Sequence, residues 1–366
     1  MILSDVCKIY DGTHQTPKYV DEGVPFYSVE HISKNDFSST KFITEDIFQK
    51  ECKRVSIEQG DVLMTRIGSV GVPKFVDWNV RASFYVSLAL FKSKTEDIHM
   101  GWLSYYIQSP NIQRDIWRLT IHVAFPKKIN LGDIGKIRMK LPSKSVQTSN
   151  YIILRSVDQK INLLTKKKEA LETYKKGLMQ KIFSQELRFK REDGTDYPEW
   201  KEAILLNICR KNSSGLSKGD LTTHGSSEVY GAAGKLEGYT DIETPRTSYV
   251  SIVKDGAGAG RVSLHLKNTS IIGTSDMIMP NEELVTPYFL YSTMSNIRWF
   301  KFIVGSTIPH IYFRDWKKET VLLPCLEEQK KIDSTLHRLG DKISTISNKI
   351  EAVQLLKKGL LQQMFV

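Results

Sequence analysis

Hydrophobic residues recur in a heptad pattern along two long segments of this chain, residues 145–184 and residues 327–366. In each segment, steps of four and three residues separate the apolar positions, and Lys168, Lys175 and Lys357 interrupt the series. A period of 3.5 residues sustained over about four heptads predicts a coiled coil. The predicted helix-pair seam consists of Val157, Ile161, Leu164, Leu171 and Leu178 in the first segment, and Leu339, Ile343, Ile346, Ile350, Val353 and Leu360 in the second.

The two segments are copies of each other. The first ends in KKGLMQKIF (175–183) and the second in KKGLLQQMF (357–365), an offset of 182 residues (357 minus 175) in a chain of 366. Each segment follows a Leu-Pro pair, at 141–142 and at 323–324. Internal repetition of this kind indicates one structural plan used twice. Two helices with matched seams are expected to pack on each other, antiparallel and about a pseudo-two-fold axis. The alternative, that each helix packs only on its own domain, stays open.

The segments between and before the helices predict two globular bodies. Short strand-like runs at 24–32, 61–67, 83–91, 248–253 and 270–279 are bounded by Gly, Pro and Asn. An aromatic, helix-like segment follows in each body, at 102–119 and 288–302. The pattern lacks the regular alternation of a doubly wound sheet and predicts a mixed α/β (α+β) fold. The expected organisation is body 1–141, helix 142–186, body 187–323 with a linker at 187–200, and helix 324–366.

The repeat extends into the bodies. The run TRIGSVGVPKF (65–75) matches VKDGAGAGRVSL (253–264) as strand, Gly-rich turn, basic residue and strand. Ile2-Leu3 with Val6-Cys7 resembles Ile204-Leu205 with Ile208-Cys209, and LGDIGKIRMKLP (131–142) matches FRDWKKETVLLP (313–324). The two bodies are therefore expected to share one fold with different surfaces.

Composition adds a preference for a polyanionic partner. Lys and Arg number 52 against 41 Asp and Glu, so the net charge is +11 and the isoelectric point is near 9.2. The four cysteines have no metal-ligand spacing, which predicts no metal site and a reduced, cytoplasmic setting. We expect no signal peptide, because the first residues, MILSDVCKIYDG, lack a basic start followed by an apolar run. We expect no membrane partner, because no apolar stretch approaches the roughly 18–20 residues that span a bilayer.

Motifs for bond chemistry are missing from the sequence. GAGAG (256–260) is not the dinucleotide-binding pattern, and it stands between two strand-like runs. AAGKLEG (232–238) has Leu236 where a phosphate-binding loop needs Ser or Thr. No Asn-Pro-Pro-Tyr type methyltransferase motif and no Pro-Asp nuclease start occur. We therefore predict no catalytic residues.

Polar loops in the bodies are the candidates for recognition. Arg, Lys, Asn, Gln, Ser and Thr read base edges, while Lys, Arg and backbone amides hold phosphates. For any one residue, a solvated loop is the alternative interpretation. The predicted DNA-binding residues are Thr13, His14, Gln15, Lys18, Arg66, Ser69 and Lys74 in the first body, and Lys211, Lys218, Lys235, Tyr239, Lys254 and Arg261 in the second.

The whole arrangement resembles the specificity subunit of a Type I restriction–modification system. The most specific features are the two helix ends, the linker RFKREDGTDYPEW (188–200) and the segment YGAAGKLEGY (230–239). The first body departs from the pattern, because no counterpart of YPEWKE precedes it.

That resemblance implies two target recognition domains, each reading one half of a split sequence in double-stranded DNA, with the helices setting their separation. It implies two methyltransferase subunits, which hold S-adenosylmethionine, and motor-nuclease subunits, which use ATP and Mg, as partners. It implies no cofactor on this chain. Two alternatives remain, a self-sufficient DNA-modifying enzyme and a coiled-coil interaction scaffold.

Overall fold

The computed structural model describes residues 1–232 and 234–365, and it divides into two compact units. Unit 1 comprises Met1–Lys166 together with the segment that begins at Ser347, and unit 2 comprises Lys167–Ile346. Each unit thus contains one body and a part of each long helix. Ala233, within the segment at 230–239, and Val366, the expected last residue of the second helix, lie outside the described residues.

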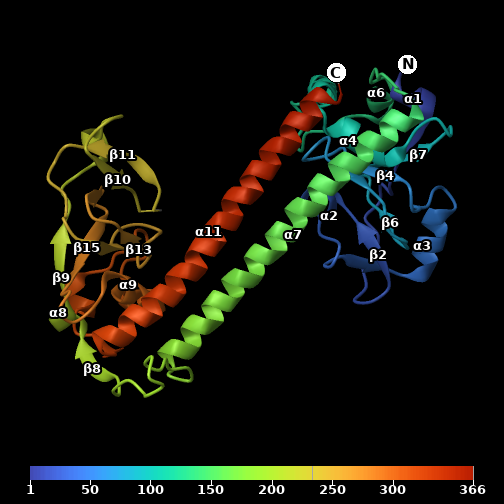
Figure 1. Cartoon of the computed structure of the whole chain (residues 1–366). Coiled ribbons are helices and arrows are strands. Elements are labelled where there is room, and N and C mark those ends of the chain that lie inside the picture. Colours follow the sequence, from blue (N-terminus) through green and yellow to red (C-terminus); the bar gives the residue numbers. More distant parts are fainter. Residues whose placement is uncertain (233, 366) are drawn as a thin grey trace. The chain divides into compact units, whose positions relative to one another are not determined.

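Unit 1 contains two sheets (Figure 1). The first is antiparallel, in the order β1-β7-β4-β5, and consists of β1 (Cys7–Asp11), β7 (Leu88–Ser93), β4 (Val62–Thr65) and β5 (Pro73–Phe75). The second is mixed, in the order β3-β2-β6, and consists of β3 (Lys41–Ile43), β2 (Val24–Tyr27) and β6 (Ser83–Phe84). The helices are α1 (Leu3–Val6), α2 (Val29–Lys34), α3 (Glu45–Cys52), α4 (Met100–Gln108), α5 (Pro110–Leu119) and α6 (Leu131–Gly135).

Unit 2 repeats this order of strands. Its antiparallel sheet runs β13-β12-β15-β9, with β9 (Cys209–Ser213), β12 (Tyr249–Val253), β13 (Val262–His265) and β15 (Ser275–Pro280). Its mixed sheet runs β11-β10-β14, with β10 (Ser227–Tyr230), β11 (Leu236–Thr240) and β14 (Thr269–Ile271). β8 (Lys201–Ile204) pairs with β16 (Thr320–Leu323). The helical elements are α8 (Leu205–Ile208), η1 (Lys218–Asp220), α9 (Pro287–Asn296), η2 (Trp299–Phe302) and α10 (Phe313–Trp316).

The strands of the two units correspond one to one. The antiparallel sheet β1-β7-β4-β5 matches the antiparallel sheet of unit 2 when that sheet is read from β9, as β9-β15-β12-β13. The mixed sheet β3-β2-β6 matches β11-β10-β14. The expectation of one mixed α/β fold used twice is therefore confirmed at the level of strand order. The short helices α1 and α8 stand at the weak sequence match noted near Ile2 and Ile204, and each is followed by a strand that starts at a buried cysteine.

Three local expectations differ from the structure. The run 24–32 is a strand only as far as Tyr27, and Val29–Lys34 forms helix α2 with Ser28 at its N-cap. The segment 102–119 is two helices rather than one, because proline at 110 excludes the helical conformation at Ser109, which adopts φ −64° and ψ 148°. Similarly, 288–302 divides into α9 and η2.

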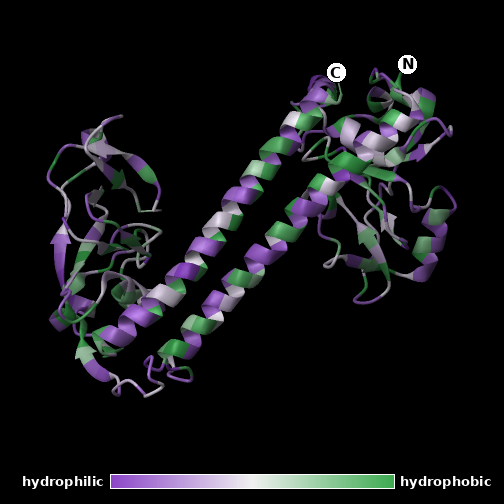
Figure 2. Cartoon of the chain, viewed as in Figure 1, coloured by the Kyte–Doolittle hydropathy of each residue, from purple (hydrophilic) through white to green (hydrophobic). Residues whose placement is uncertain are grey.

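The long helices are α7 (Lys144–Phe183) and α11 (Leu326–Gln363). Hydrophobic residues recur along both of them (Figure 2). In unit 1, Leu154 of α7 and Leu361 of α11 enter one hydrophobic core, together with Phe365. In unit 2, Ile182 of α7 and Ile332 of α11 enter another. All eleven predicted seam residues are at least half-buried, and Ile346 is the most deeply buried of them. Each core is thus completed by both long helices.

The remaining expectations concern cysteines and membranes. All four cysteines are free thiols, and burial raises the pKa of Cys7 and of Cys209 to about 12, so these two act as small apolar side chains. Among the described residues, no helix combines the length and the apolar character that crossing a bilayer requires.

Candidate nucleic-acid interface

A glycine-rich turn closes the central hairpin of each unit. The turn after β4 contains Gly68 and Gly71, with φ of 85° and 90°, and the turn after β12 contains Gly256 and Gly260, with φ of 90° and 86°. Only glycine adopts this left-handed conformation without strain. The Gly71 amide donates to the Thr65 carbonyl at 2.8 Å, and the Gly260 amide donates to the Val253 carbonyl at 2.9 Å. The predicted match between these runs is confirmed in its backbone geometry.

Each glycine turn holds a second loop. In unit 1 the Gly68 amide donates to the Lys127 carbonyl at 2.8 Å, and the Ile129 amide donates to the Arg66 carbonyl at 3.0 Å. In unit 2 the Gly256 amide donates to the Pro309 carbonyl at 2.9 Å, and the Ile311 amide donates to the Lys254 carbonyl at 2.9 Å. Segments that are about 50–60 residues apart in sequence therefore form one loop cluster in each unit.

Arg66 does not present its charge on the surface, and its assignment as a DNA-binding residue is corrected. The side chain is buried, and its guanidinium donates to the carbonyls of Val86 at 2.9 Å and Ile129 at 3.2 Å. Asp11 lies 3.5 Å away. Burial opposes ionisation of Asp11, but hydrogen bonds from Arg54 and His14 outweigh it and hold its pKa below the usual value. Arg66 therefore supports the base of the turn.

Lys254 occupies the corresponding place in unit 2. Its ammonium group lies 3.5 Å from the buried carboxylate of Asp276, and Lys211 lies 3.2 Å from the other oxygen of that carboxylate. Both lysines are partly exposed. Asp276 therefore fixes two of the predicted recognition residues side by side, with part of each side chain free to meet a phosphate.

The loop after β1 carries four more predicted residues. His14, Gln15 and Lys18 are exposed, while Thr13 is half-buried and pairs its backbone with Tyr85. His14 Nε2 lies 2.8 Å from Asp11 Oδ2. Three of the four side chains are thus accessible.

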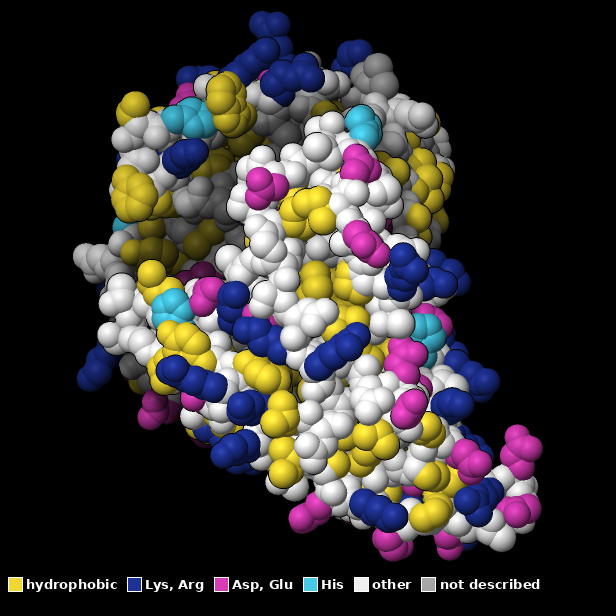
Figure 3. Space-filling view, turned by 90° about the vertical axis from the view of Figure 1, so that its left-hand side faces the viewer, with side chains coloured by type: hydrophobic (Ala, Val, Ile, Leu, Met, Phe, Trp, Pro, Cys, Tyr) yellow, Lys and Arg dark blue, Asp and Glu magenta, His cyan; other side chains and the backbone are white. Residues whose placement is uncertain are grey.

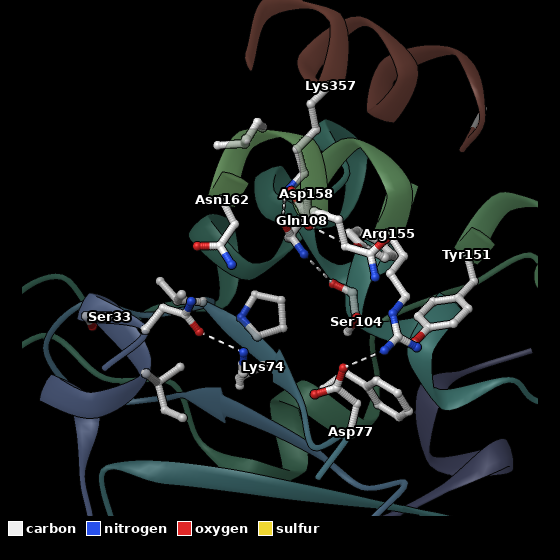
Figure 4. Close-up of a pocket in the computed structure, with 18 of the residues that line it drawn as sticks. Ser33, Lys74, Asp77, Ser104, Gln108, Tyr151, Arg155, Asp158, Asn162 and Lys357 are labelled. Atoms are coloured by element: carbon white, nitrogen blue, oxygen red, sulfur yellow. Dashed lines mark hydrogen bonds and ion pairs between the residues drawn. The ribbon is translucent and has the colours of Figure 1, made fainter. Parts of the chain in front are cut away.

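Ser69 and Lys74 flank the first glycine turn on different surfaces. Ser69 is exposed, and its hydroxyl lies 2.6 Å from that of Ser33. Lys74 points into a pocket of about 590 Å³ in unit 1, where its ammonium donates to Asn35 at 2.7 Å (Figure 4). Burial lowers the pKa of Lys74. Lys74 is consequently less accessible to a large partner than the sequence suggested.

The same pocket receives Lys357, a lysine in the seam of α11. Its ammonium contacts Asp158 of α7 at 2.8 Å and Gln108 at 3.2 Å, and Tyr105 donates to the same Asp158 carboxylate at 2.8 Å. Arg155 pairs with Asp77 across the pocket at 3.0 Å. Lys357 and Arg155 are therefore already paired with carboxylates within the unit, and Lys74 is hydrogen-bonded to an amide, which leaves the pocket a poor anion site.

The remaining predicted residues of unit 2 are spread over different loops. Lys235 and Arg261 are exposed, Tyr239 is half-buried, and Lys218 pairs with Glu237 at 2.9 Å.

On the side where Figure 1 places β9 and α8, Figure 3 shows lysine and arginine side chains with hydrophobic ones among them. A cleft of about 880 Å³ in unit 2, lined by Arg210, Asn212 and Arg246, adds polar groups that the sequence analysis did not select.

The sequence analysis also missed exposed apolar side chains on the loops that the glycine turns hold and on the helical elements that precede those loops, α5 and η2. These are Trp117, Val123 and Phe125 in unit 1 and Phe300, Val304 and Ile308 in unit 2. The stretches 116–132 and 284–314, which carry these residues, contain basic residues and no acidic ones, a sequence signal that could have found them.

No metal site is evident in the part of the chain that is described. Among those residues, no three His, Cys, Asp or Glu side chains come together in a group that could hold an ion. The surface offers hydrogen bonds, charges and apolar contacts, which are means of binding.

Comparison with known proteins supports an assignment to one family. The family model described as Type I restriction modification DNA specificity domain matches residues 1–173 and 197–355. A relative from Methanocaldococcus jannaschii, named as a putative type I restriction enzyme MjaX specificity subunit, is 24% identical over 369 residues, covering 93% of this chain and 85% of the relative. Another from the same organism, named as a type I restriction enzyme MjaVIII specificity subunit, is 25% identical over 195 residues, covering 50% and 46%.

Solved structures show the same fold. A crystal structure of an S subunit of a Type I restriction–modification system from M. genitalium matches 100% of this chain and 95% of its own, with a TM-score of 0.70 and 15% identity. A structure described in terms of complex assembly and conformational transition of the type I R-M system matches 100% and 96%, with a TM-score of 0.56 and 13% identity.

Proposed function

This chain belongs to the Type I restriction–modification DNA specificity family, and we propose that each of its two units reads one half of a bipartite DNA target. The chain is a specificity subunit, and its part in the complex is recognition, while catalysis belongs to other subunits. The observation that carries the proposal is the repeated strand order, with a glycine-turn loop cluster in each unit and different side chains on the two clusters.

The two long helices act, in this proposal, as an antiparallel, pseudo-two-fold spacer between the recognition domains. A helix of 40 residues is about 60 Å long at 1.5 Å per residue. Half-sites one turn of DNA apart are separated by about 34 Å, so the helix is long enough. The half-buried seam on both helices supports the pairing.

Binding affinity and sequence discrimination come from different groups. In this proposal, phosphate contacts supply most of the salt-dependent affinity and are made by exposed or partly exposed cations, namely Lys211, Lys235, Lys254 and Arg261. Hydrogen-bonding side chains on the loops, such as Gln15 and Ser69, discriminate base edges. Replacing a phosphate contact should weaken binding to all sequences, whereas replacing a base contact should change the motif.

The partners and cofactors follow from the family. We propose that two methyltransferase subunits dock on the helices and hold S-adenosylmethionine, and that motor-nuclease subunits use ATP and Mg. This chain itself binds no cofactor in the proposal. Because its proposed target is DNA inside the cell, we expect the assembled complex to work in the cytoplasm.

The test is co-expression of the full chain with its methyltransferase subunits, followed by sequencing that maps methylated bases. We expect methylation at one bipartite motif with an unread gap. Absence of methylation at any such motif would overturn the proposal. Methylation by the chain alone with S-adenosylmethionine would select a self-sufficient enzyme. DNA binding that is absent or insensitive to salt would favour an interaction scaffold.

A further inference from the structure

Unit 1 exposes an apolar loop tip between residues 121 and 128. The Ile121 amide donates to the Lys128 carbonyl at 2.7 Å, which closes the loop into a hairpin. At its tip, Val123 is 98% exposed and Phe125 is 103% exposed. Trp117 of α5, which is 65% exposed, lies beside the hairpin with its ring 4.8 Å from that of His122. Large side chains held fully in water mark a surface that meets a partner.

Unit 2 builds the same feature from a different sequence. The backbones of Val304 and His310 exchange hydrogen bonds of 2.9 and 2.8 Å, which closes residues 304–310 into a hairpin. Its tip carries Ile308, which is 56% exposed. Phe300, which is 72% exposed, precedes the hairpin by four residues, as Trp117 precedes Ile121 by four. Conservation of the exposed apolar character in two diverged units argues against chance.

Both hairpins are hydrogen-bonded to the glycine turns. The returning arm of each hairpin receives the amide of Gly68 in unit 1 and of Gly256 in unit 2. In unit 1, a hollow of about 260 Å³ lies between the two, lined by Gly68, Val70, Trp117, His122 and Lys127 among others. The exposed tips are therefore held in place by backbone hydrogen bonds, so little ordering would be lost on binding.

The charge of these segments matches a polyanion. Between Asp115 and Asp133 the chain has Arg118, Lys127 and Lys128 and no acidic residue. Between Glu283 and Asp315 it has Arg298, Lys301 and Arg314 and again no acidic residue. In unit 1, Lys127 and Lys128 make no ion pair with the described residues, whereas in unit 2 Lys301 pairs with Glu319 and Arg314 with Asp315. The tip in unit 1, which unpaired lysines flank, therefore suits base pairs between phosphates, while the tip in unit 2 offers mainly its apolar side chains.

We propose that the two hairpins are the apolar contacts of the protein with DNA, one for each half-site. Phe125, supported by Val123, and Ile308 press against base pairs, as apolar side chains do against thymine methyl groups or between base steps. Lys127 and Lys128 hold the adjoining phosphates in unit 1. This inference rests on the proposed function and adds to it the residues that position each half-site.

The experiment uses the full chain co-expressed with its methyltransferase subunits. The rate of methylation and the methylated motif are measured for Phe125→Ser and Ile308→Ser. Two controls accompany them. Phe125→Leu keeps an apolar tip, and Leu266→Ser removes an exposed apolar residue from outside the hairpins, with an exposure (69%) between those of Ile308 and Phe125.

We expect Phe125→Ser to lower methylation at least tenfold or to relax one half of the motif, and Ile308→Ser to affect the other half. Phe125→Leu should retain most of the rate, and Leu266→Ser all of it. Retained rate and motif in both serine variants would overturn the inference. So would loss of the methyltransferase subunit on gel filtration with unchanged DNA binding, because the hairpins would then contact protein. If the unmodified complex methylates no bipartite motif, the proposed function itself fails.

Discussion

Gln147 and Gln329 lie 182 positions apart and make the same hydrogen bonds, each within its own unit. Gln147 accepts from the His99 amide at 2.8 Å and donates to the carbonyls of Asp97 and Pro142, both at 2.8 Å. Gln329 accepts from the Thr286 amide and donates to the carbonyls of Leu284 and Pro324, all at 2.9 Å. Both side chains are completely buried. Each glutamine therefore joins the first turn of a long helix to its own body.

Replacing either glutamine should detach a helix from a body. Alanine at 147 leaves one amide and two carbonyls, all partly buried, without the glutamine as partner, and a buried group without a partner costs about 1–3 kcal/mol. We expect Gln147→Ala to destabilise unit 1, and Gln329→Ala unit 2, by about 3 kcal/mol or more. Hydrogen exchange of peptides from β7 and from β15 would measure the two units separately. Equal protection in both units of each variant would contradict the model.

The ion pair between Lys357 and Asp158 gives a test of the seam in unit 1. Asp158→Ala leaves the Lys357 ammonium without a carboxylate, whereas Lys357→Met replaces a largely buried charge by an apolar side chain of similar length. We expect Asp158→Ala to cost about 1–2 kcal/mol and Lys357→Met to be close to neutral. Chemical denaturation of the full chain measures both, and the reverse order would show that Lys357 is stabilised by other groups.

Lys175 occupies the matching seam position in unit 2, but the residue 182 positions beyond Asp158 is Gly340. A Cβ atom at Gly340 would lie 3.4 Å from the Lys175 ammonium, and burial lowers the pKa of Lys175. Gly340→Asp should therefore supply the missing partner. Gly340→Ala is the control, because it provides only the helix propensity of about 1 kcal/mol. We expect the aspartate variant to be at least as stable as the alanine variant despite the poorer helix propensity of aspartate, and the advantage to shrink in 1 M salt.

Arg66 and Arg261 were equivalent candidates in the sequence, and the structure separates them. Arg66→Ala removes a buried guanidinium that holds two carbonyls and should cost about 2–4 kcal/mol of stability. Arg261 is exposed, so Arg261→Ala should leave stability unchanged and weaken DNA binding about tenfold or less, with a shallower salt dependence. Thermal unfolding and filter binding at two salt concentrations distinguish the two effects. A stable Arg66→Ala variant would argue against its buried role.

His265 predicts a pH dependence in unit 2. It is buried beside Tyr249, its Nε2 lies 2.8 Å from the Ser251 hydroxyl, and burial lowers its pKa to about 4. The unfolded chain takes up this proton near pH 6.5, so stability is lost as pH falls from about 6.5 towards 4. The loss approaches about 3 kcal/mol at the lower end.

The comparison variant is His265→Gln, which keeps a hydrogen-bonding side chain and does not titrate. Burial raises the pKa of Asp333 to about 6, so that group acts in the opposite direction and makes unit 2 more stable on acidification. The difference between wild type and His265→Gln therefore isolates the histidine. Unfolding by urea at pH 7 and pH 5 is the measurement, and a parallel response of the two proteins would exclude the predicted role.

The sequence by itself determined the plan of the molecule. The heptad steps located α7 and α11, since side chains that face a common seam must recur every 3.5 residues. The offset of 182 identified the repeat, and the pairing of two glycine turns between strands was correct because φ near +90° restricts those positions to glycine. These features depend on local geometry, which the order of residues specifies directly.

Tertiary structure decided which polar residues are free to bind. Arg66 and Arg261 have the same chemistry, yet one donates to buried carbonyls and the other meets solvent, a difference set by segments 20 to 60 residues away. Likewise, Phe125 has an apolar side chain of the kind that usually lies in a core, yet it is fully exposed to water. Its hairpin is held by the hydrogen bond from the Gly68 amide to Lys127. Exposure results from contacts between distant segments, so a one-dimensional pattern specifies it poorly.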